Sequence, residues 1–98
     1  MKDLTVHVLF RFSKKTGKID TTMTGLGSAM MKLWALRNTT KTKVCLIVER
    51  DSGNVVFITS GTDTGFPKVK EGNLGSIENY GIPVEVVQQE CVDDRFDN

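Results

Sequence analysis

The residues that could do chemistry in this chain of 98 residues are few and far apart. His7 is the only histidine, so a metal site with two histidines is excluded and a catalytic triad would have to use this one residue. His7 alternates with Thr5 and Leu9 in a predicted strand, which favours a structural or surface histidine over a catalytic base. The two cysteines, Cys45 and Cys91, lack the spacing of metal ligands.

Cys45 lies inside an apolar run at residues 44–48, where burial would raise the pKa of its thiol and leave it inert. Buried thiols are typical of a reducing cytosol, so we expect a cytoplasmic protein. Asp93, Asp94 and Asp97 could contact a divalent cation, but nothing near them in the sequence would hold their geometry. The sequence therefore predicts a protein that is not an enzyme, with no metal site and no cofactor.

The glycine-rich segment at residues 60–75 offers the second kind of chemistry. Its first six residues, 60–65, supply backbone N–H groups and hydroxyls that could surround an anion, with Lys68 or Lys70 nearby. The segment is not a P-loop, because no Gly-Lys-Ser/Thr ends it and no helix follows at once. A small-ligand or nucleotide site in this loop is one alternative for the function.

The net charge of +1 conceals an uneven distribution. Residues 1–50 carry ten Lys and Arg against three acids, a net charge of +7, whereas residues 51–98 carry three against nine, a net charge of −6. Such a division can give a face that binds polyanions, an acidic face for a partner, or head-to-tail self-association. It gives none of these if the fold interleaves the two halves and mixes their charges on the surface.

A nucleic-acid-binding role would rest on the basic first half of the chain. Its relevant residues are Arg11, Lys14, Lys15, Lys18, Lys41 and Lys43. Arg11 alternates with Phe10 and Phe12, so it projects from the opposite strand face and an exposed aromatic stacking platform is not predicted. The sequence has no zinc-finger spacing and no RNA-binding aromatic signature.

Apolar patterning predicts the elements that must position these residues. Strict alternation at residues 4–12 indicates a half-buried strand, and the apolar runs 44–48 and 55–58 flank a turn with Gly53. Residues 13–19 repeat the pattern of residues 49–55, so we expect two similar bulged hairpins, with residues 19–23 as the returning strand of the first.

One helix is predicted at residues 26–38, from apolar residues spaced by three and four. Thr24 is the expected N-cap, and core packing is expected for Met30, Met31 and Trp34. A helix face that also meets a partner is the alternative, because Met and Trp are favoured at interfaces. After the loop at 61–75, residues 76–81 predict one helical turn between Ser76 and Gly81, and residues 84–87 a last strand.

The fold predicted is α+β: a small, mainly antiparallel sheet in the order ββαββ, then a short helical turn and a fifth strand, with one helix on one face. Residues 1–90 form a single domain and residues 91–98 an acidic, flexible tail. One helix cannot cover both apolar faces of the second hairpin. The face that needs another cover is formed by Cys45, Ile47, Val55 and Phe57. That cover would be the long loop, with Phe66, Leu74 and Ile77, or a second copy of the chain in a homodimer.

We expect a small regulatory module that acts by occupying a protein partner, of the kind that phages and mobile elements use as accessory or inhibitor proteins. Nucleic-acid binding through the basic half is the alternative of a different class, and no apolar run is long enough to span a membrane. The candidate interaction residues are Arg11, Lys14, Lys15, Lys18, Thr62, Asp63, Thr64, Phe66, Lys68 and Lys70.

Overall fold

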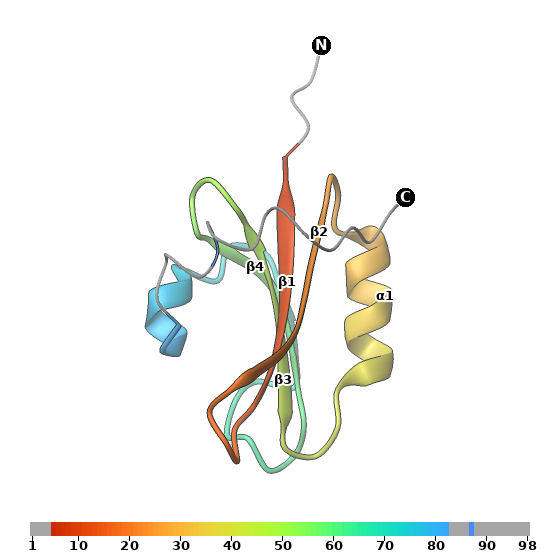
Figure 1. Ribbon diagram of the computed structural model, residues 1–98, viewed down its shortest axis with the longest axis vertical. Coiled ribbons are helices and arrows are strands. Elements are labelled where there is room, and N and C mark those ends of the chain that lie inside the picture. The colour runs from red at the N-terminus through yellow and green to blue at the C-terminus, as the bar shows by residue number, and fades with distance from the viewer. Residues whose placement is uncertain (1–4, 83–86, 88–98) are drawn as a thin grey trace.

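The computed structural model describes residues 5–82 and residue 87 of the chain. The elements are β1 (His7–Ser13), β2 (Ile19–Gly25), α1 (Ala29–Asn38), β3 (Lys43–Glu49), β4 (Val55–Ser60), β5 (Val69–Glu71) and the 3-10 helix η1 (Ile77–Tyr80). The strands form one antiparallel sheet in the order β2-β1-β3-β4-β5. Helix α1 lies on one face of this sheet and η1 on the other (Figure 1). The predicted α+β fold is confirmed.

The two hairpin turns share one backbone geometry, as the repeated sequence pattern predicts. Gly17 and Gly53 both have φ of 73°, in the left-handed region that glycine adopts without steric cost. The N–H of Gly17 donates to the carbonyl of Ser13 at 2.7 Å, and the N–H of Gly53 donates to the carbonyl of Glu49 at 2.8 Å. Each turn is followed by a register shift in its strand pair, further along the returning strand than the turn glycine, where the sequence predicted the bulge.

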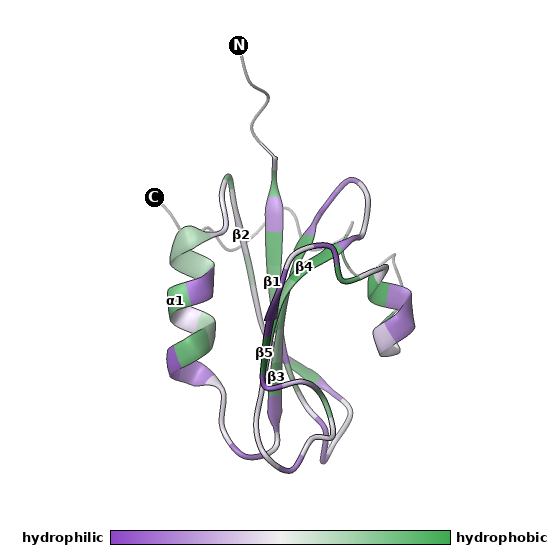
Figure 2. Ribbon diagram, turned by 180° about the vertical axis from the view of Figure 1, so that it is seen from behind, coloured by the Kyte–Doolittle hydropathy of each residue, from purple (hydrophilic) through white to green (hydrophobic). Residues whose placement is uncertain are grey.

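The sheet has an apolar core on each face, and Figure 2 shows the hydrophobic residues that run along β1, β3 and β4. The core on the η1 side consists of Val8, Phe10, Phe12, Val44, Leu46, Val48, Val55, Ile58, Ile77, Ile82 and Val87. The core on the α1 side consists of Leu9, Met31, Ala35, Cys45, Ile47 and Phe57. The alternation predicted for the first strand is therefore confirmed, because Val8, Phe10 and Phe12 share one face and Leu9 the other.

The cover of the second hairpin differs from the prediction. Cys45, Ile47 and Phe57 lie beneath α1 in the same chain, so the face predicted to need another cover is already occupied. Val55 does not belong to that face: the register shift pairs it with Val48 and turns it toward η1. The long loop does act as a cover, but of the opposite face, where Phe66, Leu74 and Ile77 pack. The apolar face predicted to join two copies of the chain is thus buried within one copy.

Helix α1 also differs in its start and in its buried face. It begins at Ala29, three residues later than predicted, and its N-cap is Ser28, whose side chain makes no capping hydrogen bond. Thr24, the predicted cap, belongs to β2. Met31 and Ala35 are fully buried, whereas Met30 is 59% exposed. The small Ala35 and the flexible Met31 are four residues apart and therefore meet the sheet together.

The segment predicted as a loop at 61–75 contains the edge strand β5, which pairs with β4. The helical turn at residues 76–81 is confirmed: the Ser76 hydroxyl accepts from the Glu78 N–H at 3.2 Å, and Gly81 ends η1 with φ of 83°. The strand predicted at 84–87, apart from Val87, and the tail at 91–98 lie outside the described residues. No helix in the described part is long and apolar enough to cross a membrane.

Candidate functional site

Three connections meet at the end of the sheet away from the N-terminus (Figure 1). They are the β1–β2 turn at residues 14–18, the α1–β3 loop at 39–42 and the β4–β5 loop at 61–68. The backbone N–H of Lys14 donates to the carbonyl of Thr42 at 2.8 Å, and that of Asp63 donates to the carbonyl of Lys41 at 3.0 Å. Because the strands are antiparallel, residues distant in sequence are brought together here.

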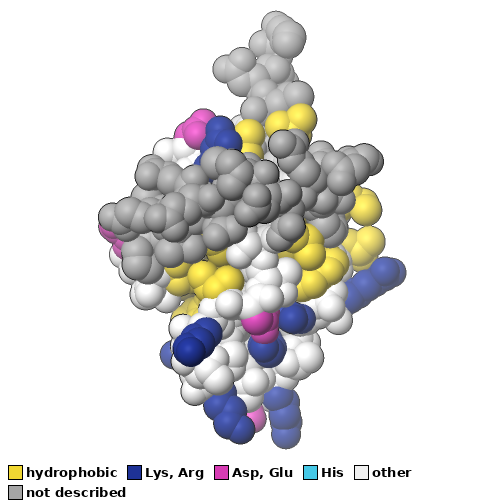
Figure 3. Space-filling model, viewed as in Figure 1, with side chains coloured by type: hydrophobic (Ala, Val, Ile, Leu, Met, Phe, Trp, Pro, Cys, Tyr) yellow, Lys and Arg dark blue, Asp and Glu magenta, His cyan; other side chains and the backbone are white. Residues whose placement is uncertain are grey.

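We call this region the basic end, because its lysines outnumber its acids. The lysines are Lys14, Lys15, Lys18, Lys41 and Lys68, and all are exposed. Figure 3 shows Lys and Arg side chains gathered at this end of the molecule. Asp63 is the one acid in the three connections, and none of the five lysines has an ion pair within residues 5–82 and 87.

Two further cations near this end are already paired, and both contact the same carboxylate. Arg11 pairs with Asp20 at 2.8 Å and its guanidinium lies 5.3 Å from the ring centroid of Trp34, while Lys43 pairs with the second oxygen of Asp20. Burial tends to raise the pKa of Asp20, but hydrogen bonds from Lys43 and Arg11 outweigh it and hold that pKa below its ordinary value. Arg11 and Lys43 therefore stabilise the fold beside the basic end.

The glycine-rich loop has little free backbone with which to bind an anion. The N–H groups of Ser60, Gly61, Asp63 and Thr64 all donate to carbonyls of the protein. Gly61 is required for another reason: a Cβ there would lie 1.9 Å from the carbonyl oxygen of Thr40. Its absent side chain lets the β4–β5 loop pack against the α1–β3 loop.

The structure brings together only part of the predicted interaction set. Lys14, Lys15, Lys18, Thr62, Asp63 and Lys68 lie at the basic end. Thr64 is buried and donates its hydroxyl hydrogen to the Gly61 carbonyl, while Phe66 packs against the rings of Phe12 and Tyr80. Lys70 lies on β5, opposite Ile58. Sequence spacing cannot show this division, since it depends on which loops meet.

The outer face of α1 carries exposed apolar side chains, among them Met30, for which core packing was predicted. Leu26, just before the helix, and Met30, Leu33 and Leu36 are 45–59% exposed. A groove of about 220 Å³ beside them is lined by Met30, Leu33, Trp34, Arg37 and Asn38. The helix has no acidic residue, and Arg37 makes no ion pair with any described residue. We call this surface the outer face of α1.

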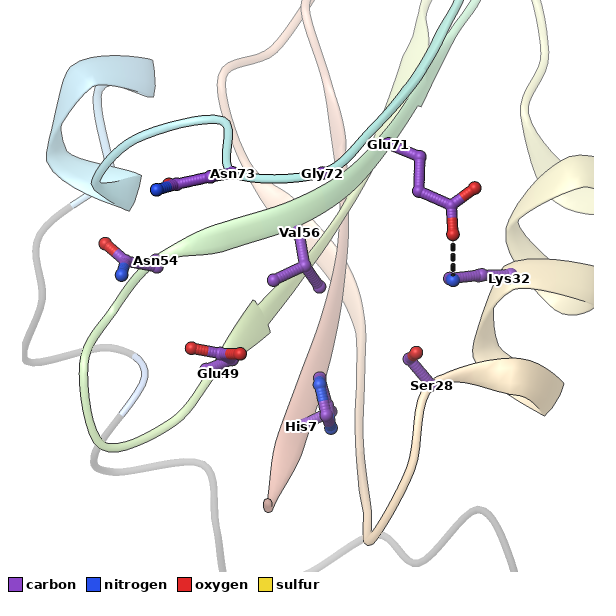
Figure 4. A pocket seen from close by; sticks show the side chains of 9 residues that line it. All are labelled: His7, Ser28, Lys32, Glu49, Asn54, Val56, Glu71, Gly72 and Asn73. Atoms are coloured by element: carbon purple, nitrogen blue, oxygen red, sulfur yellow. Dashed lines mark hydrogen bonds and ion pairs between the residues drawn. The ribbon is translucent and has the colours of Figure 1, made fainter.

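A polar hollow of about 420 Å³ lies on the α1 side of the sheet, near the helix start (Figure 4). Its lining consists of His7, Ser28, Lys32, Glu49, Asn54, Val56, Glu71, Gly72 and Asn73. His7 and Glu49 are opposite each other on β1 and β3, a pairing that the sequence analysis missed because it needs the strand register.

The charged groups of the hollow already have partners in the protein. His7 Nδ1 lies 3.0 Å from the carbonyl oxygen of Thr5, which fixes a donor role for Nδ1. Glu49 accepts from the Ser52 hydroxyl at 3.1 Å, and Lys32 pairs with Glu71. No group of three or more His, Cys, Asp or Glu in the described part of the chain is placed to hold a metal. Among the described residues, the hollow therefore shows no nucleophile hydrogen-bonded to a base.

Cys45 is fully buried in the core on the α1 side. Burial raises the pKa of its thiol, which outweighs the opposing hydrogen bonds from Thr39 and Thr59. The predicted direction of the pKa shift is confirmed, and a neutral buried thiol is a poor nucleophile. Cys91 lies outside the described residues.

No protein-family model matches the chain, and the curated proteins and the solved structures gave no match either.

Proposed function

We propose that this chain is a non-enzymatic protein-binding module, which acts in the cytoplasm by occupying a protein partner at the outer face of α1. One observation carries the proposal: four large apolar side chains on and beside one helix stay about half exposed, although the same helix buries Met31 and Ala35 against the sheet. Contiguous exposed apolar residues are typical of interaction sites.

The chemistry of this face indicates the kind of partner. Met adapts to varied apolar surfaces, Trp supplies a large rigid apolar area, and Arg37 at the groove edge would pair with a carboxylate. We therefore propose a partner segment that is apolar with an acidic residue at its margin.

Burial of the four exposed apolar side chains would not by itself give a stable complex. Completing the burial of a half-exposed Leu or Met contributes about 1 kcal/mol, so the four residues contribute about 4 kcal/mol. Association costs at least about 4 kcal/mol in lost freedom of motion. The partner must therefore also contact the groove with Trp34 and Arg37 to bind stably.

The test compares two surface changes in a capture experiment from a lysate of the source organism. The variant Met30→Asp/Leu33→Asp places charge on the outer face of α1, and Val69→Asp is the matched control, because Val69 is 55% exposed on β5. A partner should bind the wild-type chain and Val69→Asp but not the double variant, and the purified partner should show the same order in a calorimetric titration. Circular dichroism must show that all three chains are folded.

Partners that bind the double variant as well as the wild type would contradict the proposal. A second copy of this chain is the other occupant to consider. Sedimentation over a range of concentrations would reveal it as a dimer mass that the double variant loses and Val69→Asp keeps.

A further inference from the structure

We propose that the basic end binds the phosphate backbone of nucleic acid, as a function separate from partner docking on α1. Five exposed lysines from three connections converge there, and Asp63 is the one acid among them. Hydrogen bonds between the connections hold the lysines on a packed framework, as between Lys14 and Thr42 and between Asp63 and Lys41. Neutralising phosphates with such lysines releases counterions, which drives binding.

The lysines are not explained by the needs of the fold. Lys15, Lys18, Lys41 and Lys68 make no side-chain hydrogen bond or ion pair within the described residues. Lys14 has one side-chain contact, with its Nζ 5.2 Å from the ring centroid of Phe66. Like charges brought together at one surface repel each other, so the cluster lowers the stability of the isolated chain. An anionic ligand would remove this repulsion.

The surroundings favour nucleic acid over an acidic protein. Protein interfaces use buried apolar anchors and are depleted in lysine. The exposed large apolar side chains of the described residues lie on and beside α1, except Val69, which directly follows Lys68 at the margin of the basic end. The five lysines thus supply the point charges that contact phosphates. The apolar groups nearby lie at the margin of the basic end, at Val69 and at a hollow of about 270 Å³ lined by Lys14, Ile19 and Tyr80 among others.

The same surroundings predict binding that does not depend on base sequence. Phe66 is the one aromatic residue in the three connections, and it is half-buried against Phe12 and Tyr80. It is therefore not available as a platform on which bases stack. The three connections contain no helix that could enter a groove.

The experiment is fluorescence anisotropy with labelled single-stranded and double-stranded oligonucleotides of mixed sequence, as a function of salt. Five phosphate contacts give a slope of log affinity against log salt of at most about −4.5 on duplex DNA. The variant Lys14→Gln/Lys15→Gln/Lys18→Gln should reduce that slope by about 2.7. The control Lys32→Gln/Arg50→Gln/Lys70→Gln removes the same charge outside the basic end and should leave the slope within error of the wild type.

Three results would overturn this inference: no binding at low salt, an equal loss in both triple variants, or binding of poly-glutamate as tight as that of the oligonucleotides. Tight binding to vesicles with phosphatidylserine, without binding to oligonucleotides, would also overturn it and assign the lysines to a lipid surface. The variant Met30→Asp/Leu33→Asp should bind oligonucleotides as the wild type does, so failure of partner docking and failure of this inference can be told apart.

Discussion

The two hairpin turns have the same backbone geometry but different charges. Each turn has glycine at φ of 73°, a glycine N–H bonded four residues back, and a hydroxyl that accepts the N–H two residues later. The β3–β4 turn combines Arg50 with Asp51 in an ion pair at 3.3 Å. The β1–β2 turn has Lys14 and Lys15 at the corresponding positions, and Lys18 where the other turn has Asn54.

This difference separates what the fold requires from what it permits. The glycine and the hydroxyl are shared, so the backbone of a bulged turn explains them. The lysines are not shared, and the β3–β4 turn forms the same geometry without them. Their accumulation beside Lys41 and Lys68 therefore points to a ligand and not to folding.

The largest expected effect breaks the packing beside the β1–β2 turn, where the β4–β5 loop lies against the α1–β3 loop at the basic end. Gly61→Ala would place a Cβ 1.9 Å from the Thr40 oxygen and force the two loops apart. We expect a loss of about 2 kcal/mol or more in the free energy of unfolding, measured with urea, because overpacking against backbone costs about 1–3 kcal/mol.

The matched control for that experiment is Gly27→Ala. Gly27 has open space around its missing side chain and no positive φ, so alanine there should leave the stability unchanged or raise it slightly. Equal stabilities for Gly61→Ala and the wild type would contradict the close approach of the loops.

A smaller effect on stability tests whether the two turn glycines, Gly17 and Gly53, play the same role. Gly17→Ala should cost about 1 kcal/mol, because its φ of 73° is unfavourable for alanine although the space is open. Gly53→Ala should cost at least as much, because Gly53 is buried and its carbonyl accepts the N–H of Ile77 at 2.8 Å. Thermal unfolding of both variants checks this, and a destabilised Gly17→Ala beside an unaffected Gly53→Ala would break the comparison.

The smallest effect on stability is expected when charges are exchanged between the turns. Lys15→Asp/Lys18→Asn gives the β1–β2 turn the charge pattern of the β3–β4 turn, and Asp51→Lys/Asn54→Lys does the reverse. All four positions lie on the turns, outside both apolar cores, so each exchange should change the free energy of unfolding by less than about 0.5 kcal/mol. A loss of several kcal/mol in urea unfolding would show that the lysines are structural.

The sequence predicts those parts of the fold that local patterns determine. Alternation in the first strand and the glycines of the two turns give the hairpins, because period-two burial and positive φ are local properties. Ser76 and Gly81 likewise predict the limits of the helical turn. The fold class follows from these elements, whose order the structure confirms.

Other features depend on contacts that one segment does not contain. Helix α1 is apolar over most of its circumference, so periodicity cannot distinguish the buried Met31 from the exposed Met30. The register shift that moves Val55 to the η1 side depends on strand pairing. The basic end was only partly predicted, since its lysines meet through loops that pack across the sheet end.

The exchange variants also give the most direct test of the central claim, that the charge of the β1–β2 turn serves a ligand while its backbone serves the fold. The measurement is the affinity of wild type, Lys15→Asp/Lys18→Asn and Asp51→Lys/Asn54→Lys for one labelled oligonucleotide at low salt, beside their urea midpoints. We predict equal urea midpoints for the three chains. Lys15→Asp/Lys18→Asn should lose affinity for the oligonucleotide, and Asp51→Lys/Asn54→Lys should show no gain of comparable size. Equal affinity in the wild type and Lys15→Asp/Lys18→Asn, at equal stability, would contradict the claim.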